Sequence, residues 1–286
     1  MVKKPNILFG LFFMDFRVFD NGLQELSEQL DLSQQRSFLY GDGHFTTAKV
    51  KNGHVEHLSL HLERLERAHK QLKFNPVLWN KLKNTIVDTA SAYSLAVLKV
   101  QISRGQSVRG YGQALRASPA IFISISPLTE DTSNQLPAID LNSVETALAQ
   151  QPLLAGIKHC NRLEQVLIAH ELDSKGEEDG LVSDTQGHLI ETNKANIFWL
   201  QNDTWYTPSL NLSGVAGVQR EFLLQKLAAQ ETLQCIDKIK ENIRAAFICN
   251  SLMGIRAVAH FAGKTLDLAP VELLKQELLM KESHHG

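Results

Sequence analysis

Strand-like and helix-like patterns alternate along the first 127 residues of the chain. The predicted strands are rich in β-branched and aromatic residues, and the predicted helices carry apolar residues at intervals of three and four. The strands cover residues 7–13 (with an extension to about 21), 45–50, 55–58, 96–102 and 120–125, and the helices cover 59–72 and 77–92. Asn52-Gly53 predicts a hairpin turn, because both residues tolerate positive φ. Residues 1–127 are therefore predicted to form a first domain, of α/β type.

A second pattern of strands and helices begins after a polar stretch. Residues 128–137 follow one proline and end on another, which predicts a connector to a second domain over 138–286. In that domain we predict strands at 138–144, 179–184, 189–200 (interrupted before 197) and 247–251. We also predict three helices: one that ends near 172, one that runs from a turn at 213–217 to about 230, and one that begins at 271. The predicted fold class is α+β with two domains.

Lys158 lies where two patterns meet. Residues 153–157 are an apolar, extended-looking run, and Asn161 is a good N-cap for the helix that follows. The apolar face predicted for that helix is formed by Leu163, Val166, Leu167 and His170. A lysine among apolar neighbours loses its proton more readily, because desolvation disfavours the charged form. A neutral amine is what Schiff-base chemistry needs, and a solvated lysine in a turn is the alternative.

Charged residues elsewhere add to this chemistry. Glu191 lies between the start of a strand and a small irregular segment, so its carboxylate is predicted to be partly enclosed and to need a cationic or protonated partner. His61 and Arg64 are three residues apart and share one helix face, where they either face an anion or form a solvated edge. In the Gly-rich loop 103–112, either Arg104 or Arg109 could hold a substrate carboxylate; an ordinary surface loop is the alternative.

Two further segments fit an anion such as phosphate. The turn 213–217 is rich in glycine and leads into a helix, whose first N–H groups are unpaired. Asn250-Ser251 ends a strand with two hydrogen-bonding side chains. Many helices begin this way and bind nothing, and Asn-Ser also ends strands for local reasons.

Composition narrows the class of protein. The chain has 286 residues, is 43% hydrophobic and carries a formal net charge of −2, so no bulk field favours nucleic acid or membrane. Three scattered cysteines without a Cys-x-x-Cys pair predict neither a disulfide framework nor a zinc site, and they fit a reducing cytoplasm. The apolar run 7–13 follows two lysines like a short signal peptide, but no small-residue cleavage site follows.

Four motifs occur in an order that resembles the fold-type IV pyridoxal-phosphate enzymes, a family that includes branched-chain and D-amino acid aminotransferases and aminodeoxychorismate lyases. The motifs are His61-x-x-Arg64, Lys158-x-x-Asn161, Glu191 followed by Asn196-Ile197-Phe198, and Gly217-Val218-x-Arg220. The resemblance covers roughly residues 38–258. Within the family, the segments 41–48, 102–105, 109–111 and 157–165 are similar to the lyases. The resemblance implies a cofactor bound between the two domains and a homodimer.

The resemblance also implies a role for each motif residue. Lys158 is expected to be the Schiff-base lysine and proton-transfer base, Glu191 to face the pyridine nitrogen, and Thr46 to assist the leaving group. Expected cofactor or phosphate ligands are His61, Arg64, Asn196, the amides of Val218 and Gln219, Asn250 and Ser251. Expected substrate ligands are His44, Arg109 and Tyr111. No metal is expected.

The implied reaction converts 4-amino-4-deoxychorismate to 4-aminobenzoate and pyruvate, with pyridoxal 5′-phosphate as cofactor, in folate synthesis. An aminotransferase of the same fold and a non-catalytic binding protein are the alternatives. Two features depart from the family: the chain before Ser37 is longer than the usual short opening strand, and Gly254-Ile255-Arg256 stands where relatives often have a proline-containing turn. Neither touches the expected cofactor residues.

Overall fold

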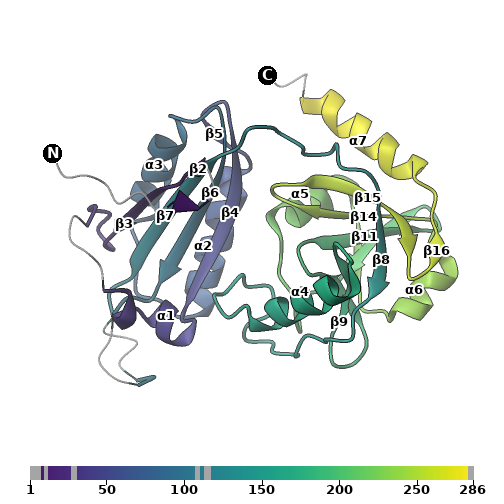
Figure 1. Cartoon of the computed structure of the whole chain (residues 1–286), viewed down its shortest axis with the longest axis horizontal. Coiled ribbons are helices and arrows are strands. Elements are labelled where there is room, and N and C mark those ends of the chain that lie inside the picture. Colours follow the sequence, from purple (N-terminus) through teal and green to yellow (C-terminus); the bar gives the residue numbers. More distant parts are fainter. Residues whose placement is uncertain (1–7, 10–11, 27–30, 107–109, 113–116, 283–286) are drawn as a thin grey trace. The chain divides into compact units, whose positions relative to one another are not determined.

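The computed structural model describes residues 8–9, 12–26, 31–106, 110–112 and 117–282, which form two compact units (Figure 1). Unit 1 contains the chain up to Asp131 together with Lys158–Asn161. Unit 2 contains Thr132–Ile157 and the chain from Arg162. The change of unit after Asp131 falls within the predicted connector 128–137. The assignment of Lys158–Asn161 to unit 1 is a difference from the predicted domains, because this segment lies far along the second half of the chain.

Unit 1 is built on a five-stranded antiparallel sheet. Its strand order is β3-β7-β6-β4-β5, and the helices α2 and α3 pack on it. In chain order the elements are β1 (Leu8–Phe9), β2 (Phe12–Phe13), β3 (Asp15–Phe19), the 3-10 helix η1 (Leu32–Gln34), α1 (Arg36–Tyr40), β4 (Gly43–Lys51), β5 (His54–Val55), α2 (Leu58–Gln71), α3 (Trp79–Ala90), β6 (Leu95–Ser103) and β7 (Ala120–Pro127). The predicted Asn52-Gly53 hairpin turn is present, with positive φ at both residues.

The two faces of this sheet differ in chemistry. On β6, Leu98, Val100 and Ile102 are buried in the core with Leu65 of α2 and Leu82 of α3. Side chains alternate between the faces of a strand. The residues between the core positions therefore point to the opposite face, which we call the open face; it carries Phe45 and Thr47 of β4, Lys99 and Gln101 of β6, and Phe122 and Ser124 of β7.

The N-terminal strand of the sheet falls in the predicted extension of the first strand to about residue 21 and not in residues 7–13. Asp15–Phe19 pairs with β7, whereas the predicted strand 7–13 supplies only the small β1–β2 pair among its described residues. Asp15 and Arg17 alternate with apolar residues in β3, so its sequence lacks a continuous apolar pattern. The Arg17 guanidinium of β3 is paired with Glu25 at 2.7 Å. The helices η1 and α1, which follow β3 in the chain, were not predicted.

Unit 2 contains a nine-stranded sheet. The order is β10-β9-β8-β15-β14-β11-β12-β13, with β16 paired to β15. Its elements are β8 (Ile139–Ser143), α4 (Leu163–Lys175), β9 (Gly180–Ser183), β10 (Leu189–Thr192), β11 (Asn196–Gln201), β12 (Thr204–Pro208), α5 (Val218–Leu227), β13 (Gln230–Thr232), α6 (Ile236–Asn242), β14 (Ala245–Asn250), β15 (Gly254–Phe261), β16 (Lys264–Thr265) and α7 (Ala269–Glu282).

The central strands of this sheet are apolar on both faces. On β11, Ile197 and Trp199 join one core cluster with Ile239 of α6, whereas Phe198 joins another with Val271 of α7. A strand buried on both faces has an unbroken run of apolar residues, which explains the sequence Ile-Phe-Trp-Leu.

Among the residues described, no helix has the length and apolarity needed to cross a bilayer.

Three expectations around Lys158 were wrong. The run 153–157 is not a strand: it forms turns that end in an isolated bridge at Gly156. Asn161 does not cap α4, whose N-cap is Arg162; instead the Asn161 amide donates to the Gly41 carbonyl. The face predicted to be buried on α4 is exposed, with Leu163 at 71% and Val166 at 59%. Ile168 and Leu172 are buried instead, because they pack on the core under the helix.

Candidate active site

The backbone of Lys158 extends the sheet of unit 1. The Phe45 amide donates to the Lys158 carbonyl at 2.9 Å, and the Cys160 amide donates to the Gly43 carbonyl at 2.9 Å. His44 and His159 form the antiparallel bridge between these two bonds. Lys158 is therefore held by main-chain pairing along the edge of β4, and its side chain is half-buried.

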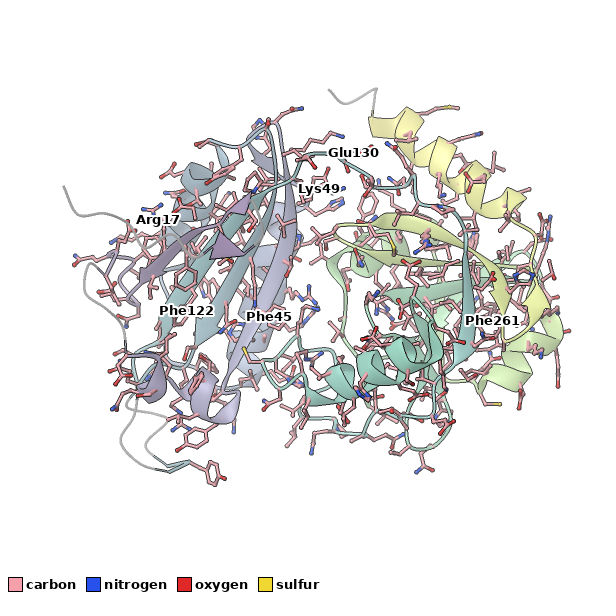
Figure 2. The ribbon with its side chains drawn as sticks, in the orientation of Figure 1. Arg17, Phe45, Lys49, Phe122, Glu130 and Phe261 are labelled. Atoms are coloured by element: carbon pink, nitrogen blue, oxygen red, sulfur yellow. The ribbon has the colours of Figure 1, made fainter. Side chains whose placement is uncertain are left out.

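The Lys158 side chain lies on the open face of the sheet. Its ammonium nitrogen is 5.1 Å from the centroid of the Phe45 ring, which Figure 2 labels. Phe45 and Thr47 are two residues apart on β4, so their side chains share this face, whereas Thr46 between them points to the other. Sequence reasoning missed Phe45 as a neighbour of the lysine. The register of β4 is the signal that could have identified it.

Thr46 is buried on the side of the sheet that faces α2. Its hydroxyl lies 2.6 Å from Nδ1 of His61, and Arg64 is buried on the same helix. His61 and Arg64 thus share a face, as predicted, and this face is buried rather than a solvated edge. The structure brings Thr46 and His61 together, but it separates Thr46 from the face on which the Lys158 amine lies.

His44 also points away from that face. It is 1% exposed, and its ring lies against Phe74 and His69 at centroid distances of 5.2 and 5.7 Å. Neither ring nitrogen has a hydrogen-bond partner among the described residues. This burial favours a packing role for His44 over the contact with substrate that the resemblance implied.

The buried histidines predict a loss of stability in acid. Burial, reinforced by nearby cationic groups, lowers the pKa of His44 and the pKa of His61 to about 3. Both rings stay neutral in the folded chain, while the unfolded chain binds protons below about pH 6.5. The free energy of unfolding should therefore be intact above pH 6.5. Between there and about pH 3 it should fall by up to about 1.4 kcal/mol per pH unit for each histidine.

A matched pair of variants isolates this effect. In urea unfolding at pH 7.5 and 5.5, His44→Phe should lower the pH dependence of the midpoint, because an aromatic ring without a titrating group fills the same apolar space. His170→Gln, at an exposed position on α4, should keep the dependence of the native chain. Equal pH dependence in His44→Phe and the native chain would contradict the assignment.

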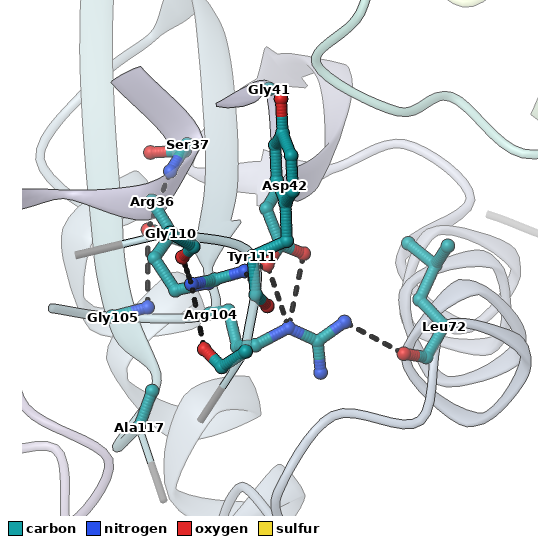
Figure 3. A network of polar contacts seen from close by, with 12 residues as sticks. Arg36, Ser37, Gly41, Asp42, Leu72, Arg104, Gly105, Gly110, Tyr111 and Ala117 are labelled. Carbon is teal, nitrogen blue, oxygen red and sulfur yellow. Dashed lines mark hydrogen bonds and ion pairs between the residues drawn. The ribbon is translucent and has the colours of Figure 1, made fainter. Parts of the chain in front are cut away.

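Three charged residues that sequence reasoning did not connect hold the loop after β6. The Asp42 carboxylate accepts hydrogen bonds from Arg36 and from Arg104, each at 2.8 Å (Figure 3). Arg36 also donates to the carbonyls of Gly110 and Tyr111. Because Arg104 is engaged by Asp42, it is not available for the substrate carboxylate, which was one of the two alternatives for this loop.

Tyr111 is anchored by its backbone while its side chain is open. The side chain is 82% exposed, and its ring lies 5.2 Å from that of Tyr40. Arg109, the other expected substrate ligand of this loop, lies outside the described residues. The Arg36–Asp42–Arg104 network thus determines where the backbone at Tyr111 lies relative to β4.

In unit 2, Glu191 is enclosed as predicted. The side chain is 6% exposed, and Oε2 accepts a hydrogen bond from the Val215 amide at 2.9 Å. Gly214 lies against this carboxylate, where a Cβ would be 2.5 Å from Ile190 and 3.4 Å from Glu191 Oε2. The Ser213 hydroxyl in the same turn is buried and has no hydrogen-bond partner among the described residues.

Asn196 organises the same turn from the start of β11. Its amide nitrogen donates to the Val215 carbonyl at 2.8 Å, and its oxygen accepts from the Gly217 amide at 3.1 Å. A Cβ on Gly217 would collide with the Asn196 oxygen, so this position requires glycine. Gly217 is the N-cap of α5, and no side chain among the described residues caps this helix start, where the amides of Val218 and Gln219 lie. Asn196 is thus a positioning residue for an open helix N-terminus.

The polar groups at the end of β14 are engaged locally. Asn250 Oδ1 accepts from the amides of Leu252 and Met253, and its amide nitrogen donates to the Lys194 carbonyl. These bonds agree with the alternative that Asn250-Ser251 ends the strand for local reasons, because the side chain of Asn250 stabilises the turn that follows it. Ser251 lies in that turn and is half-buried.

Asp179 is a further residue of this region that sequence reasoning missed. Its buried carboxylate accepts hydrogen bonds from the Thr192 hydroxyl and the Asn193 amide, and burial raises the pKa of Asp179. These bonds hold the irregular segment between Glu191 and Asn196. The only sign of this role of Asp179 in the sequence was a carboxylate at the start of a predicted strand.

Comparison with known proteins identifies the family. The model of amino-transferase class IV matches residues 43–261. The chain belongs to the class IV aminotransferase family. The resemblance inferred from the motifs is thereby confirmed, and so is the α+β fold class of fold-type IV. The predicted place of the cofactor between the two domains stays a prediction.

Individual members of the family differ in their similarity to the chain. An aminodeoxychorismate lyase of Vibrio harveyi is 38% identical over 248 residues, which cover 84% of this chain and 89% of the relative. The crystal structure of 4-amino-4-deoxychorismate lyase from Pseudomonas aeruginosa matches with a TM-score of 0.81 and 30% identity, covering 95% of this chain and 98% of that one. A putative branched-chain-amino-acid aminotransferase of Methanocaldococcus jannaschii is 24% identical over 206 residues, 70% of each chain.

Proposed function

We propose that this class IV aminotransferase family member is a pyridoxal-phosphate-dependent lyase that converts 4-amino-4-deoxychorismate to 4-aminobenzoate and pyruvate. The observation that carries the proposal is the 38% identity with the Vibrio harveyi lyase along 84% of the chain. The similarity to the aminotransferase is lower and covers less of the chain.

The residues present fit the cofactor. Pyridoxal phosphate needs an amine for its aldehyde, an acidic partner for its ring nitrogen and donors for its phosphate. The half-buried Lys158 supplies the amine, and the enclosed carboxylate of Glu191 supplies the acidic partner. The open amides of Val218 and Gln219, the buried hydroxyl of Ser213 and the guanidinium of Arg64 are the phosphate donors that we propose.

The protein's own residues carry the proton transfers. When bound, pyridoxal phosphate supplies an electron sink for the carbon that bears the substrate amine. Lys158 Nζ removes the proton from that ring carbon. The C–O bond to the enolpyruvyl group then breaks, the ring becomes aromatic, and the departing group takes up a proton to leave as pyruvate. Phe45 covers the amine on the open face and limits its contact with water.

Thr47 replaces Thr46 as the proposed partner of the leaving group. Thr47 lies on the face of β4 that carries Phe45, whose ring is 5.1 Å from the Lys158 amine. Thr46 points to α2, where its hydroxyl is engaged by His61. A hydroxyl on the same face as the base is the one that can hand a proton to the departing oxygen or carbon.

Substitution of the two threonines distinguishes these roles. Thr47→Val should lower kcat about a hundred-fold with the cofactor still bound, because proton transfer to the leaving group is lost. Thr46→Val should leave kcat within a few-fold and destabilise the fold by about 1–3 kcal/mol, because it leaves a buried His61 nitrogen unpaired. Steady-state kinetics and urea unfolding measure both effects. A larger loss of kcat in a well-folded Thr46→Val would reverse the assignment.

Two incubations test the proposed reaction itself. Purified enzyme loaded with pyridoxal phosphate is given 4-amino-4-deoxychorismate, and 4-aminobenzoate and pyruvate are measured. A second sample receives a branched-chain or D-amino acid with 2-oxoglutarate. We expect the two products in equal amounts in the first incubation and little glutamate in the second. Amino-group transfer without 4-aminobenzoate would reject the lyase and support the aminotransferase.

The location and assembly of the enzyme are part of the proposal. We infer a cytoplasmic homodimer that uses a small-molecule substrate and binds neither nucleic acid nor membrane. The exposed apolar side chains of Leu163, Val166 and Leu167 on α4 support a protein partner, because a contiguous apolar patch at the surface marks an interface. Light scattering of the purified enzyme measures its state of assembly.

A further inference from the structure

Asn161 is the residue of the motif Lys158-x-x-Asn161 that does not cap the helix after it. Its side-chain amide donates instead to the Gly41 carbonyl at 3.1 Å, within unit 1. Two main-chain bonds of the same segment reach Phe45 and Gly43 on this edge of the sheet, each at 2.9 Å. The three bonds fall on alternate residues, 45, 43 and 41, so the side chain of Asn161 continues the ladder one step beyond the start of β4.

Gly41 leaves room for this amide. Its φ is +64°, and a Cβ at this position would collide with the side chain of Asn161. The Gly41 carbonyl also accepts from the Gly43 amide at 2.8 Å. Between the two glycines, the carboxylate of Asp42 is bound by two arginines (Figure 3). The backbone that receives Asn161 is therefore held in place by other contacts of unit 1.

The neighbouring residue pair shows the same kind of fit. A Cβ on Gly43 would be 3.0 Å from Sγ of Cys160 and 2.9 Å from the Ile102 carbonyl. Every residue of β4 after Gly43 carries a Cβ, so a movement of the segment along the strand would bring its side chains against occupied positions. The alignment thus follows from the fit between the two segments, and neither segment shows it alone.

We propose that Asn161 is a positioning residue for Lys158, because its bond to Gly41 fixes the alignment of the lysine segment on β4. The inference rests on the proposed function, in which the amine moves a proton. The alignment keeps this amine 5.1 Å from the centroid of the Phe45 ring. A shift of one residue would turn the lysine to the other face of the sheet, where Thr46 is buried. Without the Asn161 bond the two main-chain bonds remain, so the segment should stay attached and adopt the reactive alignment less often.

Hydrogen exchange measures this alignment without the cofactor. The amides of Phe45 and Cys160 donate between the two segments, so their exchange reports on how often the segments separate. Asn161→Ala removes the donor, and Asn161→Asp keeps the shape of the side chain but cannot donate. In both variants these two amides should exchange about ten-fold faster than in the wild type, with or without pyridoxal phosphate. Amides that join β6 to β7 should keep their rates.

The matched control is Asn142→Ala. Asn142 is an exposed asparagine of β8 in unit 2, and its amide donates to Glu177 at 2.9 Å. This variant loses a side-chain hydrogen bond of the same donor and should leave the exchange of Phe45 and Cys160 unchanged. Wild-type exchange rates at both amides in both Asn161 variants would overturn the proposal.

Kinetics distinguish positioning from a structural role. Asn161→Ala should lower kcat for 4-amino-4-deoxychorismate about three- to ten-fold at full cofactor loading, because the amine is misplaced for proton transfer. KM should change little, since no contact with the substrate is removed. Faster exchange together with an unchanged kcat would show that the alignment does not govern the reaction, and would also overturn the role of Asn161.

A double variant tests whether Asn161 acts through Gly41. Gly41→Ala places a methyl group where the amide lies, so it should lower kcat at least as much as Asn161→Ala. When the two are combined, the loss should equal that of Gly41→Ala alone, because the bond is already broken. Losses that multiply would mean that the two residues act independently, which contradicts the proposal.

The outcomes separate this inference from the proposed function. A wild-type enzyme that makes no 4-aminobenzoate refutes the proposed reaction. The exchange of Phe45 and Cys160 is read from the protein without turnover, so it still shows whether Asn161 fixes the alignment of Lys158.

Discussion

Lys158→Ala should abolish formation of 4-aminobenzoate, with a loss of kcat of at least about 10³- to 10⁴-fold, because a single amine both holds the cofactor and moves the proton. The substitution removes only the side chain. The backbone bonds between Lys158 and Phe45 remain, so the edge of the sheet should keep its structure. The variant should also lose the absorbance band of the lysine-bound cofactor, near ~410 nm for a protonated Schiff base.

Two controls make this result specific. Lys70→Ala, at an exposed position on α2, should keep the band and the activity. Borohydride reduction of the wild type should fix the cofactor on a peptide that contains Lys158, as read by mass spectrometry. Turnover that survives in Lys158→Ala, or reduction on another lysine, would show that a different residue is the base.

Glu191→Gln should lower kcat about 10- to 100-fold, because the loss of a charge-assisted hydrogen bond costs roughly 1.5–3 kcal/mol. Glutamine has nearly the same volume and retains an oxygen that can accept from the Val215 amide. The turn 213–217 should therefore keep its conformation, and the effect should come from the missing charge. The absorbance maximum of the bound cofactor should shift as well, since the ring nitrogen loses its acidic partner.

The matched control for this substitution is Glu241→Gln, which removes a carboxylate from an exposed position on α6. It should leave both kcat and the spectrum unchanged. Glu191→Gln activity equal to that of the wild type, with pyridoxal phosphate bound, would mean that the enclosed carboxylate does not act on the cofactor. In that case the carboxylate would have a structural role, which includes holding the Val215 amide.

Much of the framework could be predicted because it depends on local patterns. The hairpin at Asn52-Gly53 follows from two residues that accept positive φ. The segment from Ile197 reads as a buried strand because each of its side chains is apolar. His61 and Arg64 share a face because they are three residues apart on one helix. In each case the relevant contact or conformation lies within a few residues of the chain.

The errors arose where distant segments decide the structure. The run 153–157 has strand-like composition, but positive φ at Gly156 and its bridge to Val215 fix it as a turn. Asn161 is a good cap by residue type, yet the Gly41 carbonyl takes its amide. The apolar side chains of Leu163 and Val166 predicted a buried face, whereas the core under α4 is reached by Ile168 and Leu172.

By itself, the sequence determined the family and singled out Lys158 and Glu191 as candidate site residues, because those motifs keep their residue types and spacing wherever the rest of the chain lies. Only the tertiary structure decided which side chains accompany the lysine. The pairing of Lys158 with the edge of β4 places Phe45 and Thr47 on its face and turns Thr46 towards α2. A shift of one residue in that register would exchange the two threonines, and no pattern within either segment specifies how the two segments align.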